Sequence, residues 1–217
     1  MTGPTARLAP LGDAALTITY AATLDPSARE RTLRDAAAID RARLPGVVEV
    51  VPGYVALTVH YDPLEVGFGD LRDRLLPVLA RAATHRDRQA GRSITIPVRY
   101  DGPDLDWVAE TAGLPRDEVI ARHSGVEYEV GLLGFVPGFA YLGPLDPALV
   151  LPRRPSPRPR VPAGSVAIAG EQTGIYPAAV PGGWHLIGTT PVRLFDPGRS
   201  PPSYLAVGDR VRFVPER

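Results

Sequence analysis

Three residue types are absent from this 217-residue chain: cysteine, lysine and asparagine. Without cysteine the chain forms no disulfide, holds no metal through thiolates and has no cysteine nucleophile. The absence of lysine excludes a phosphate-binding lysine of the P-loop type, a Schiff base and a lysine general base, so every strong cation is an arginine. The absence of asparagine excludes N-linked glycosylation.

The charge and hydropathy of the chain exclude further classes of function. Lysine plus arginine and aspartate plus glutamate both number 24, so the formal net charge is zero and gives no general attraction to nucleic acid or anionic membranes. No stretch reaches the roughly 20 apolar residues of a membrane-spanning helix, and residues 1–10 show no secretory signal. We therefore expect a cytoplasmic protein with no nucleic-acid partner and no membrane partner.

The first part of the chain predicts the order strand, helix, strand, strand, helix. The expected strands are residues 14–20, 47–51 and 54–60, and the expected helices are residues 26–44 and 68–83. Asp25 is the predicted N-cap of the first helix, and Pro77 lies inside the second, where it can kink it. This order is most of a split βαβ, ferredoxin-like unit.

A polar linker at residues 84–92, which includes His85, leads to a second region rich in proline and glycine. Its pattern predicts two short helices, with Asp104 or Asp101 as the cap of the first, and an ordered extended loop at residues 153–160. Many short strands broken by turns favour a closed barrel or a sandwich. The expected strands are residues 93–100, 128–133, 165–169, 174–176, 184–187, 192–195 and 210–214, and the expected helices are residues 104–112 and 115–123.

None of the four histidines lies at a spacing typical of metal ligands, so no metal site is predicted. His123 lies at the end of a predicted helix, where a positively charged side chain would interact favourably with the helix C-terminus. This structural role and a role in a binding site are equally favoured. His185 follows Gly182 and Gly183, which allow a ligand close to the backbone. A site role for His185 is therefore favoured over an exposed position on a strand.

Other polar residues are candidates for ligand binding. Gln172, with an amide that both donates and accepts, suits a lactam or carboxamide, or it is the structural residue of a tight turn. Arg153 and Arg158 suit a carboxylate or a phosphate, or they are solvated cations of a basic loop. Glu127 is a functional or a solvated carboxylate. The predicted binding residues are Gln172, Tyr176, Gly183, His185, Arg158, Arg153, His123 and Glu127, and no catalytic residue is predicted.

The run from Gly134 to Gly143, GFVPGFAYLG, resembles a signature of the 5-oxoprolinase B-type subunit family, also called the Kip inhibitor (KipI) or allophanate hydrolase subunit 1 family. Further motifs match the family in order and spacing, and the resemblance covers essentially the whole chain. They lie at residues 45–49, 52–53, 152–154, 157–158, 161–166, 172–177, 181–188, 194–197 and 208–214.

The resemblance implies an α+β protein, with a small N-terminal ferredoxin-like α/β domain at residues 1–88 and a C-terminal cyclophilin-like β-barrel at residues 89–217. It also implies membership of an ATP-dependent 5-oxoprolinase complex, which converts 5-oxo-L-proline to L-glutamate. The expected partners are a KipA-like C-type subunit and a LamB/YcsF-like A-type subunit, with ATP and Mg²⁺ in the assembled complex and no activity of this chain alone. Because similar proteins carry glutamine at the position of His185, we assign His185 to binding rather than to catalysis.

Alternative functions stay open within the same resemblance. One is a regulatory inhibitor of a sensor histidine kinase. Another is one component of an allophanate- or urea-type amide hydrolase or carboxyltransferase. A prolyl isomerase, which rests on the barrel fold alone, is the weakest alternative.

Overall fold

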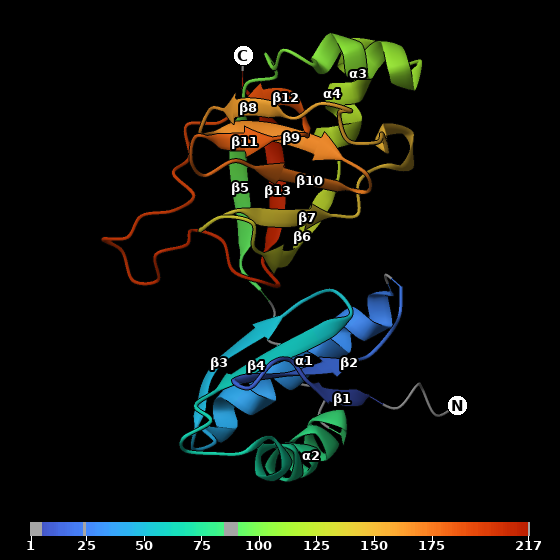
Figure 1. Ribbon diagram of the computed structural model, residues 1–217. Coiled ribbons are helices and arrows are strands. Elements are labelled where there is room, and N and C mark those ends of the chain that lie inside the picture. Colours follow the sequence, from blue (N-terminus) through green and yellow to red (C-terminus); the bar gives the residue numbers. More distant parts are fainter. Residues whose placement is uncertain (1–5, 24, 85–90, 217) are drawn as a thin grey trace. The chain divides into compact units, whose positions relative to one another are not determined.

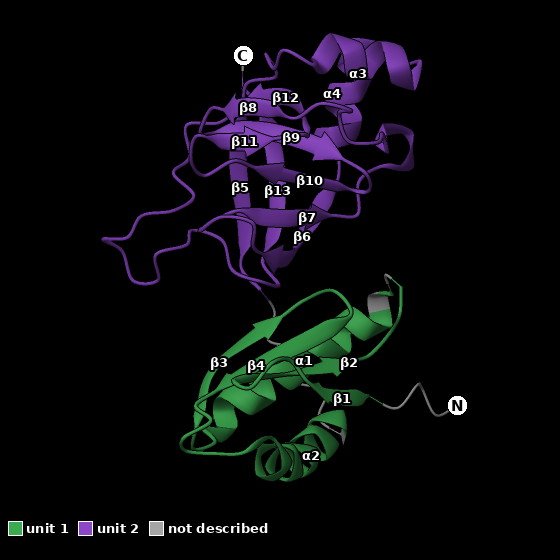
Figure 2. Ribbon diagram, in the orientation of Figure 1, with its two compact units in different colours: residues 1–89 green, residues 90–217 purple. Residues whose placement is uncertain are grey.

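The computed structural model of the chain describes residues 6–23, 25–84 and 91–216. The chain forms two compact units, residues 1–89 and 90–217 (Figure 1, Figure 2). His85 and the predicted domain boundary between residues 88 and 89 lie outside the described residues. No helix in the described part of the chain is both long and apolar enough to span a bilayer.

The first unit is a four-stranded antiparallel sheet with two helices (Figure 1). The strand order is β1-β2-β4-β3, and Leu16, Leu57, Ile39 and Leu71, one each from β2, β4, α1 and α2, are buried in its core. The elements are β1 (Arg7–Pro10), β2 (Ala15–Thr19), α1 (Pro26–Ala42), β3 (Val47–Pro52), β4 (Ala56–Tyr61) and α2 (Phe68–Thr84).

The ends of the helices in this unit largely follow from the neighbouring residues. The Asp25 carboxylate accepts a hydrogen bond from the backbone N–H of Ala28 at 2.9 Å, which confirms it as the N-cap of α1. The helix ends where Arg43 adopts a left-handed conformation with φ 45°. α2 continues through Pro77. The edge strand β1 has no counterpart among the predicted strands, because its four residues show little alternation.

The second unit is built on a seven-stranded sheet that curls on itself (Figure 1). Its order is β12-β9-β10-β7-β6-β13-β5, and all pairs are antiparallel except β13 with β5. Arg99, just after β5, and Thr189, at the end of β12, exchange backbone hydrogen bonds of 2.9 and 2.8 Å, so the two outer strands meet. The strands are β5 (Ser93–Val98), β6 (Glu127–Leu133), β7 (Ala140–Gly143), β9 (Ser165–Ala169), β10 (Gln172–Ile175), β12 (His185–Thr189) and β13 (Arg210–Pro215).

Smaller elements cover this sheet. β8 (Arg158–Val161) pairs with β11 (Val180–Gly182) in a two-stranded sheet, so the end of the predicted extended loop is a strand. The helices are α3 (Leu105–Ala112), α4 (Arg116–Ser124) and the short η1 (Pro147–Leu149). The predicted strand at residues 192–195 is wrong: only Phe195 forms an isolated bridge, with Ser203. The structure is thus of the mixed helix-and-sheet class.

Candidate functional site

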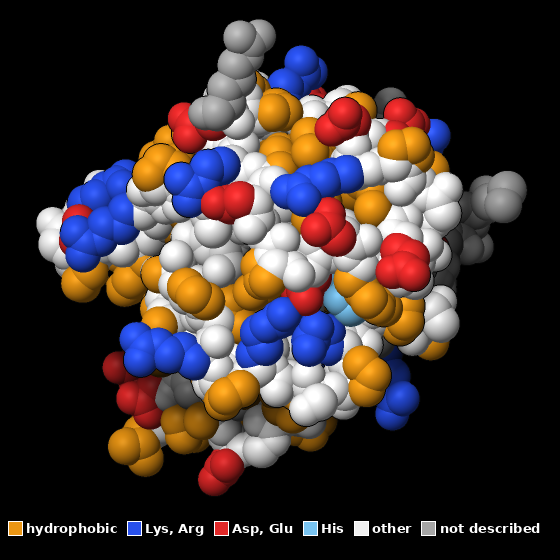
Figure 3. Space-filling view, turned by 90° about the horizontal axis from the view of Figure 1, so that it is seen from above, with side chains coloured by type: hydrophobic (Ala, Val, Ile, Leu, Met, Phe, Trp, Pro, Cys, Tyr) orange, Lys and Arg blue, Asp and Glu red, His pale blue; other side chains and the backbone are white. Residues whose placement is uncertain are grey.

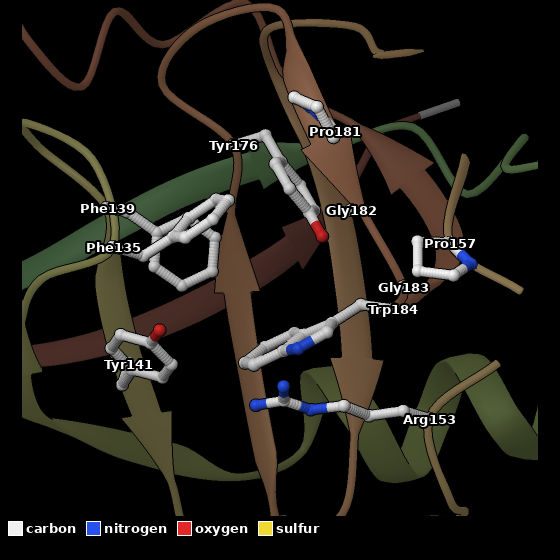
Figure 4. A pocket seen from close by; sticks show the side chains of 10 residues that line it. All are labelled: Phe135, Phe139, Tyr141, Arg153, Pro157, Tyr176, Pro181, Gly182, Gly183 and Trp184. Atoms are coloured by element: carbon white, nitrogen blue, oxygen red, sulfur yellow. The ribbon is translucent and has the colours of Figure 1, made fainter. Parts of the chain in front are cut away.

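The second unit holds a cavity of about 240 Å³ with largely aromatic walls (Figure 4). This volume is below the roughly 300–1,000 Å³ typical of pockets for drug-sized ligands, so the cavity suits a smaller molecule. The loop between β6 and β7, the segment before β8, and the ends of β10 and β11 contribute to its walls. The lining residues are Phe135, Phe139, Tyr141, Arg153, Pro157, Tyr176, Pro181, Gly182, Gly183 and Trp184.

Phe139 is the centre of the aromatic wall. Its ring centroid lies 4.9 Å from Tyr141, 5.3 Å from Tyr176, 5.5 Å from Trp184 and 5.5 Å from Phe135, each in an edge-to-face arrangement. Such pairs contribute about 0.5–1.5 kcal/mol each beyond the burial of their area. The wall is therefore held in shape before any ligand arrives.

Two glycines make this packing possible. A Cβ atom on Gly182 would lie 2.3 Å from the Tyr176 hydroxyl, and a Cβ on Gly174 would lie 3.0 Å from the Phe139 ring and 2.9 Å from the Ala140 carbonyl oxygen. Any larger residue would push the rings out of place. Gly174 and Gly182 therefore allow the aromatic rings to pack closely and give the cavity its shape.

Arg153 carries the only charge among the ten lining residues (Figure 4). Burial raises the pKa of the Tyr141 and Tyr176 phenols, which therefore stay neutral, and the nearby Arg153 guanidinium opposes that rise. Arg153 is exposed and pairs with no carboxylate in the described part of the chain. Aromatic walls with one cation suit a small planar anion.

The rim residue Phe135 has a strained backbone. Its φ is 70°, and the Val136 N–H donates to the Gly134 carbonyl oxygen at 2.9 Å, which makes a γ-turn with a positive central φ. Bulky residues rarely adopt this conformation, and it costs about 1–3 kcal/mol where it occurs. The turn places Phe135, a residue that is 58% exposed, at the edge of the cavity and of the neighbouring surface.

Substitutions of Phe135 separate strain from contact. Phe135→Gly and Phe135→Ala both remove the ring, but only glycine accepts the positive φ without strain. We expect the glycine variant to be about 1 kcal/mol more stable than the alanine variant in urea unfolding. Equal stability of the two variants would show that the turn stores no strain.

Asp104, next to the cavity lining in space, holds two arginines. Its Oδ1 accepts from Arg154 Nη1 at 3.1 Å and from Arg158 Nη2 at 2.7 Å, and its Oδ2 accepts from the backbone N–H of Leu186 at 2.7 Å. We call Asp104, Arg154 and Arg158 the Asp104 clamp. Burial raises the pKa of the Asp104 carboxyl, but the hydrogen bonds from Arg158 and Leu186 outweigh burial and hold the pKa below its usual range.

The clamp corrects one prediction from the sequence. Asp104 does occupy the N-cap position of α3, but its side chain makes no capping hydrogen bond. The carboxylate is turned towards β12 instead, because the segment before it lies against that strand. Gly102 permits this approach, since a Cβ there would lie 2.3 Å from the Leu186 carbonyl oxygen.

His185 supports the chain beside the cavity rather than lining it. The residue is buried, its Nε2 donates to the Pro152 carbonyl oxygen at 2.8 Å, and its ring stacks on Trp107 with centroids 4.3 Å apart. Pro152 immediately precedes Arg153. His185 therefore fixes the backbone from which the cavity's cation extends.

His123 lies in the core of the second unit and not in the cavity. The Tyr100 hydroxyl donates to its Nδ1 at 2.7 Å, and its Nε2 donates at 2.8 Å to the Thr173 hydroxyl, which in turn donates to the Ala167 carbonyl oxygen. Burial lowers the pKa of His123 to about 3. A neutral, enclosed imidazole neither contacts a ligand nor acts as a cation at the end of α4, so neither interpretation from the sequence holds.

The other predicted residues are distributed around the unit. Arg153, Tyr176 and Gly183 meet in the cavity, and Arg158 lies in the clamp. Gln172 begins β10 and Glu127 begins β6, where Glu127 pairs with Arg210 at 3.0 Å; neither lines the cavity. Within the described ranges, no three His, Cys, Asp or Glu side chains form a group that could hold a metal ion.

Sequence reasoning missed most of the cavity wall. Phe135, Phe139 and Tyr141 all belong to the run GFVPGFAYLG. In the sequence this run indicates only the family. The spacing of its aromatic residues between glycines is a signal that could have found them. The role of Asp104 has no local signal, because its partners lie 50, 54 and 82 positions along the chain.

Comparisons with known proteins identify relatives along most of the chain. The family model for the carboxyltransferase domain, subdomain C and D, matches residues 6–205. The B-type subunit of 5-oxoprolinase from Bacillus subtilis is 40% identical over 94% of this chain and 90% of the relative. The B-type subunit of 5-oxoprolinase from Escherichia coli O157:H7 is 48% identical over 80% of each chain.

Solved structures share the fold of this chain. The crystal structure of TTHA0988 is 43% identical with a TM-score of 0.84, covering 94% of this chain and 40% of that one, so this chain spans about two fifths of its length. The urea carboxylase of Kluyveromyces lactis, at 20% identity, shares the fold over 97% of this chain and 22% of that one, with a TM-score of 0.77. The chain thus belongs to the family of 5-oxoprolinase B-type subunits.

Proposed function

We propose that this chain works within an ATP-dependent 5-oxoprolinase and that its aromatic cavity binds 5-oxo-L-proline. The observation that carries the proposal is the combination of aromatic walls with the single cation Arg153. 5-Oxoproline is a small five-membered lactam with one carboxylate. Its ring suits contact with Phe139 and Trp184, and its carboxylate suits a bidentate contact with the guanidinium. The names of the curated relatives support this substrate.

Partner subunits complete the proposed reaction. A lactam is a poor electrophile, so its hydrolysis to L-glutamate is coupled to ATP, which activates the lactam oxygen by phosphorylation. None of the ten lining residues is a histidine or a carboxylate, and the phenols of Tyr141 and Tyr176 stay neutral, so the cavity offers no general base. The base therefore comes from a partner chain, and this chain alone is inactive as a cyclic-amide hydrolase.

The expected partners are the KipA-like C-type subunit and the LamB/YcsF-like A-type subunit, with ATP and Mg²⁺ bound in the complex. The name of the matching family model, two subdomains of a larger domain, supports an incomplete site in this chain. So does the greater length of TTHA0988, of which this chain covers 40%. We infer a cytoplasmic location for this complex, which agrees with its proposed need for ATP.

The finer fold assignment is also a proposal. We infer a ferredoxin-like domain at residues 1–88, supported by the antiparallel sheet with two helices, although its fourth strand precedes the others in the chain. We infer a cyclophilin-like barrel at residues 89–217, supported by the bridge between Arg99 and Thr189 that joins the outer strands.

Arg153→Gln tests the placement of the substrate. A hydrogen bond between charged groups contributes about 1.5–3 kcal/mol, so we expect the KM for 5-oxoproline to rise about 10- to 100-fold in the enzyme reconstituted from its subunits. The kcat should change little, because Arg153 contacts the carboxylate and not the reacting amide. Arg210→Gln, which removes an arginine that pairs with Glu127, is the matched control.

A second ligand sharpens this test. 2-Pyrrolidinone is the same lactam without the carboxylate, so its binding should be equal in the wild type and in Arg153→Gln. If Arg153→Gln leaves the KM for 5-oxoproline unchanged, or weakens both ligands alike, the carboxylate does not sit on Arg153 and the placement is wrong.

A further inference from the structure

The Asp104 clamp has more positive than negative charge. Two guanidinium groups share one carboxylate, which leaves an excess of one positive charge, and Arg153 adds another beside it. Figure 3 shows basic side chains on the molecular surface with acidic side chains interspersed among them. Asp104 is the only carboxylate that pairs with Arg154 or Arg158 in the described part of the chain.

The clamp also contains hydrogen-bond donors without acceptors. Arg154 Nε and Arg158 Nη1 are buried and have no partner among the described residues. The two side chains are nevertheless 33% and 23% exposed, so both arginines are partly accessible from solvent. Two donors of charged groups without acceptors leave both guanidinium groups incompletely compensated by Asp104, which favours an added anion on their accessible side.

The clamp lies directly beside the aromatic cavity. Arg154 follows the cavity residue Arg153, and Arg158 follows the cavity residue Pro157. The backbone N–H of Arg154 donates at 2.9 Å to the carbonyl oxygen of Gly183, which lines the cavity. An anion bound to the clamp would therefore sit at the rim of the cavity.

We propose that Arg154 and Arg158 form a phosphate-binding subsite at the rim of the aromatic cavity, with Asp104 as the residue that positions both guanidinium groups. The planar fork of arginine matches the geometry of phosphate oxygens. The assignment of this phosphate to the reaction rests on the proposed function: it is a phosphate of ATP or the phosphate transferred to the lactam oxygen. Both are phosphate groups that must lie next to the lactam.

Binding of inorganic phosphate to the full chain tests the subsite. Isothermal titration calorimetry at low salt should show binding that is weakened about tenfold or more in Arg158→Gln and in Arg154→Gln, with Asp104 still paired in each. Arg210→Gln should bind like the wild type. Saturating 5-oxoproline should leave phosphate binding intact. Unchanged affinity in both clamp variants, or an equal loss in Arg210→Gln, overturns the subsite.

Two further measurements identify the source of the phosphate and test the phosphate subsite independently of the proposed oxoprolinase function. Displacement of inorganic phosphate by ATP assigns the subsite to the nucleotide, and simultaneous binding assigns it to a phosphate already transferred. An active oxoprolinase whose clamp variants bind phosphate normally would refute the subsite alone. Clamp-dependent phosphate binding in a chain that supports no glutamate release would keep the subsite and refute the function.

Discussion

Acidification from pH 6.5 to pH 3 is expected to destabilise the second unit by on the order of 4 kcal/mol through His123 alone. In the folded protein burial lowers the pKa of His123 to about 3, whereas the unfolded chain binds this proton near the ordinary histidine pKa of 6.5. The unfolded state therefore binds one more proton between these values. The free energy of unfolding falls by about 1.4 kcal/mol per pH unit as the pH decreases.

Urea unfolding between pH 6.5 and 4.5 measures this slope. Both tryptophans, Trp107 and Trp184, lie in the second unit, so their fluorescence reports on it directly. His123→Gln should lose the His123 part of the slope, whatever its stability at neutral pH. His60→Gln, in the first unit, should retain it. A His123→Gln variant with the wild-type slope would mean that His123 is protonated in the folded protein.

Asp104→Ala is expected to lower the free energy of unfolding by about 3 kcal/mol, at the lower end of the range for a broken buried ion pair because the two arginines are partly exposed. The variant leaves two guanidinium groups without their carboxylate and the Leu186 N–H without its acceptor. Urea unfolding at pH 7 measures the loss. Asp104→Asn keeps one acceptor oxygen and should lose less.

The stabilisation by Asp104 changes over a different pH range from that of His123. The Asp104 pKa is lowered in the folded state, so its stabilisation is fully present above the unfolded value of about 3.9 and is lost as the pH falls through the folded value. Measurements above pH 4.5 thus isolate His123. An Asp104→Ala variant as stable as the wild type would show that the clamp contributes no net stability.

Local patterns in the sequence predict most elements, but not how distant segments meet. The Asp25 cap and both long helices follow from neighbouring residues. The strand expected at residues 192–195 has suitable apolar residues but finds no neighbour beyond one bridge at Phe195. A strand depends on its partner, and the partner is not visible in a local window.

The candidate site illustrates the same limit. Arg153 and Tyr176 are both among the binding residues predicted from the sequence, and both line the cavity. His123 is a candidate in the sequence because histidines often act in sites, but its hydrogen bond to Thr173 spans 50 positions and encloses it in the core. The sequence predicts Asp104 only as a helix cap, because nothing near it indicates Arg158 or Leu186.

Glutamate release from 5-oxoproline tests the central claim most directly. The assay compares this chain mixed with the A-type and C-type subunits, in the presence and absence of ATP, with mixtures that lack each component. We predict glutamate release that requires ATP and all three chains, and none from this chain alone. Release at an equal rate without this chain, or no release from the complete mixture, would contradict its assignment to a 5-oxoprolinase.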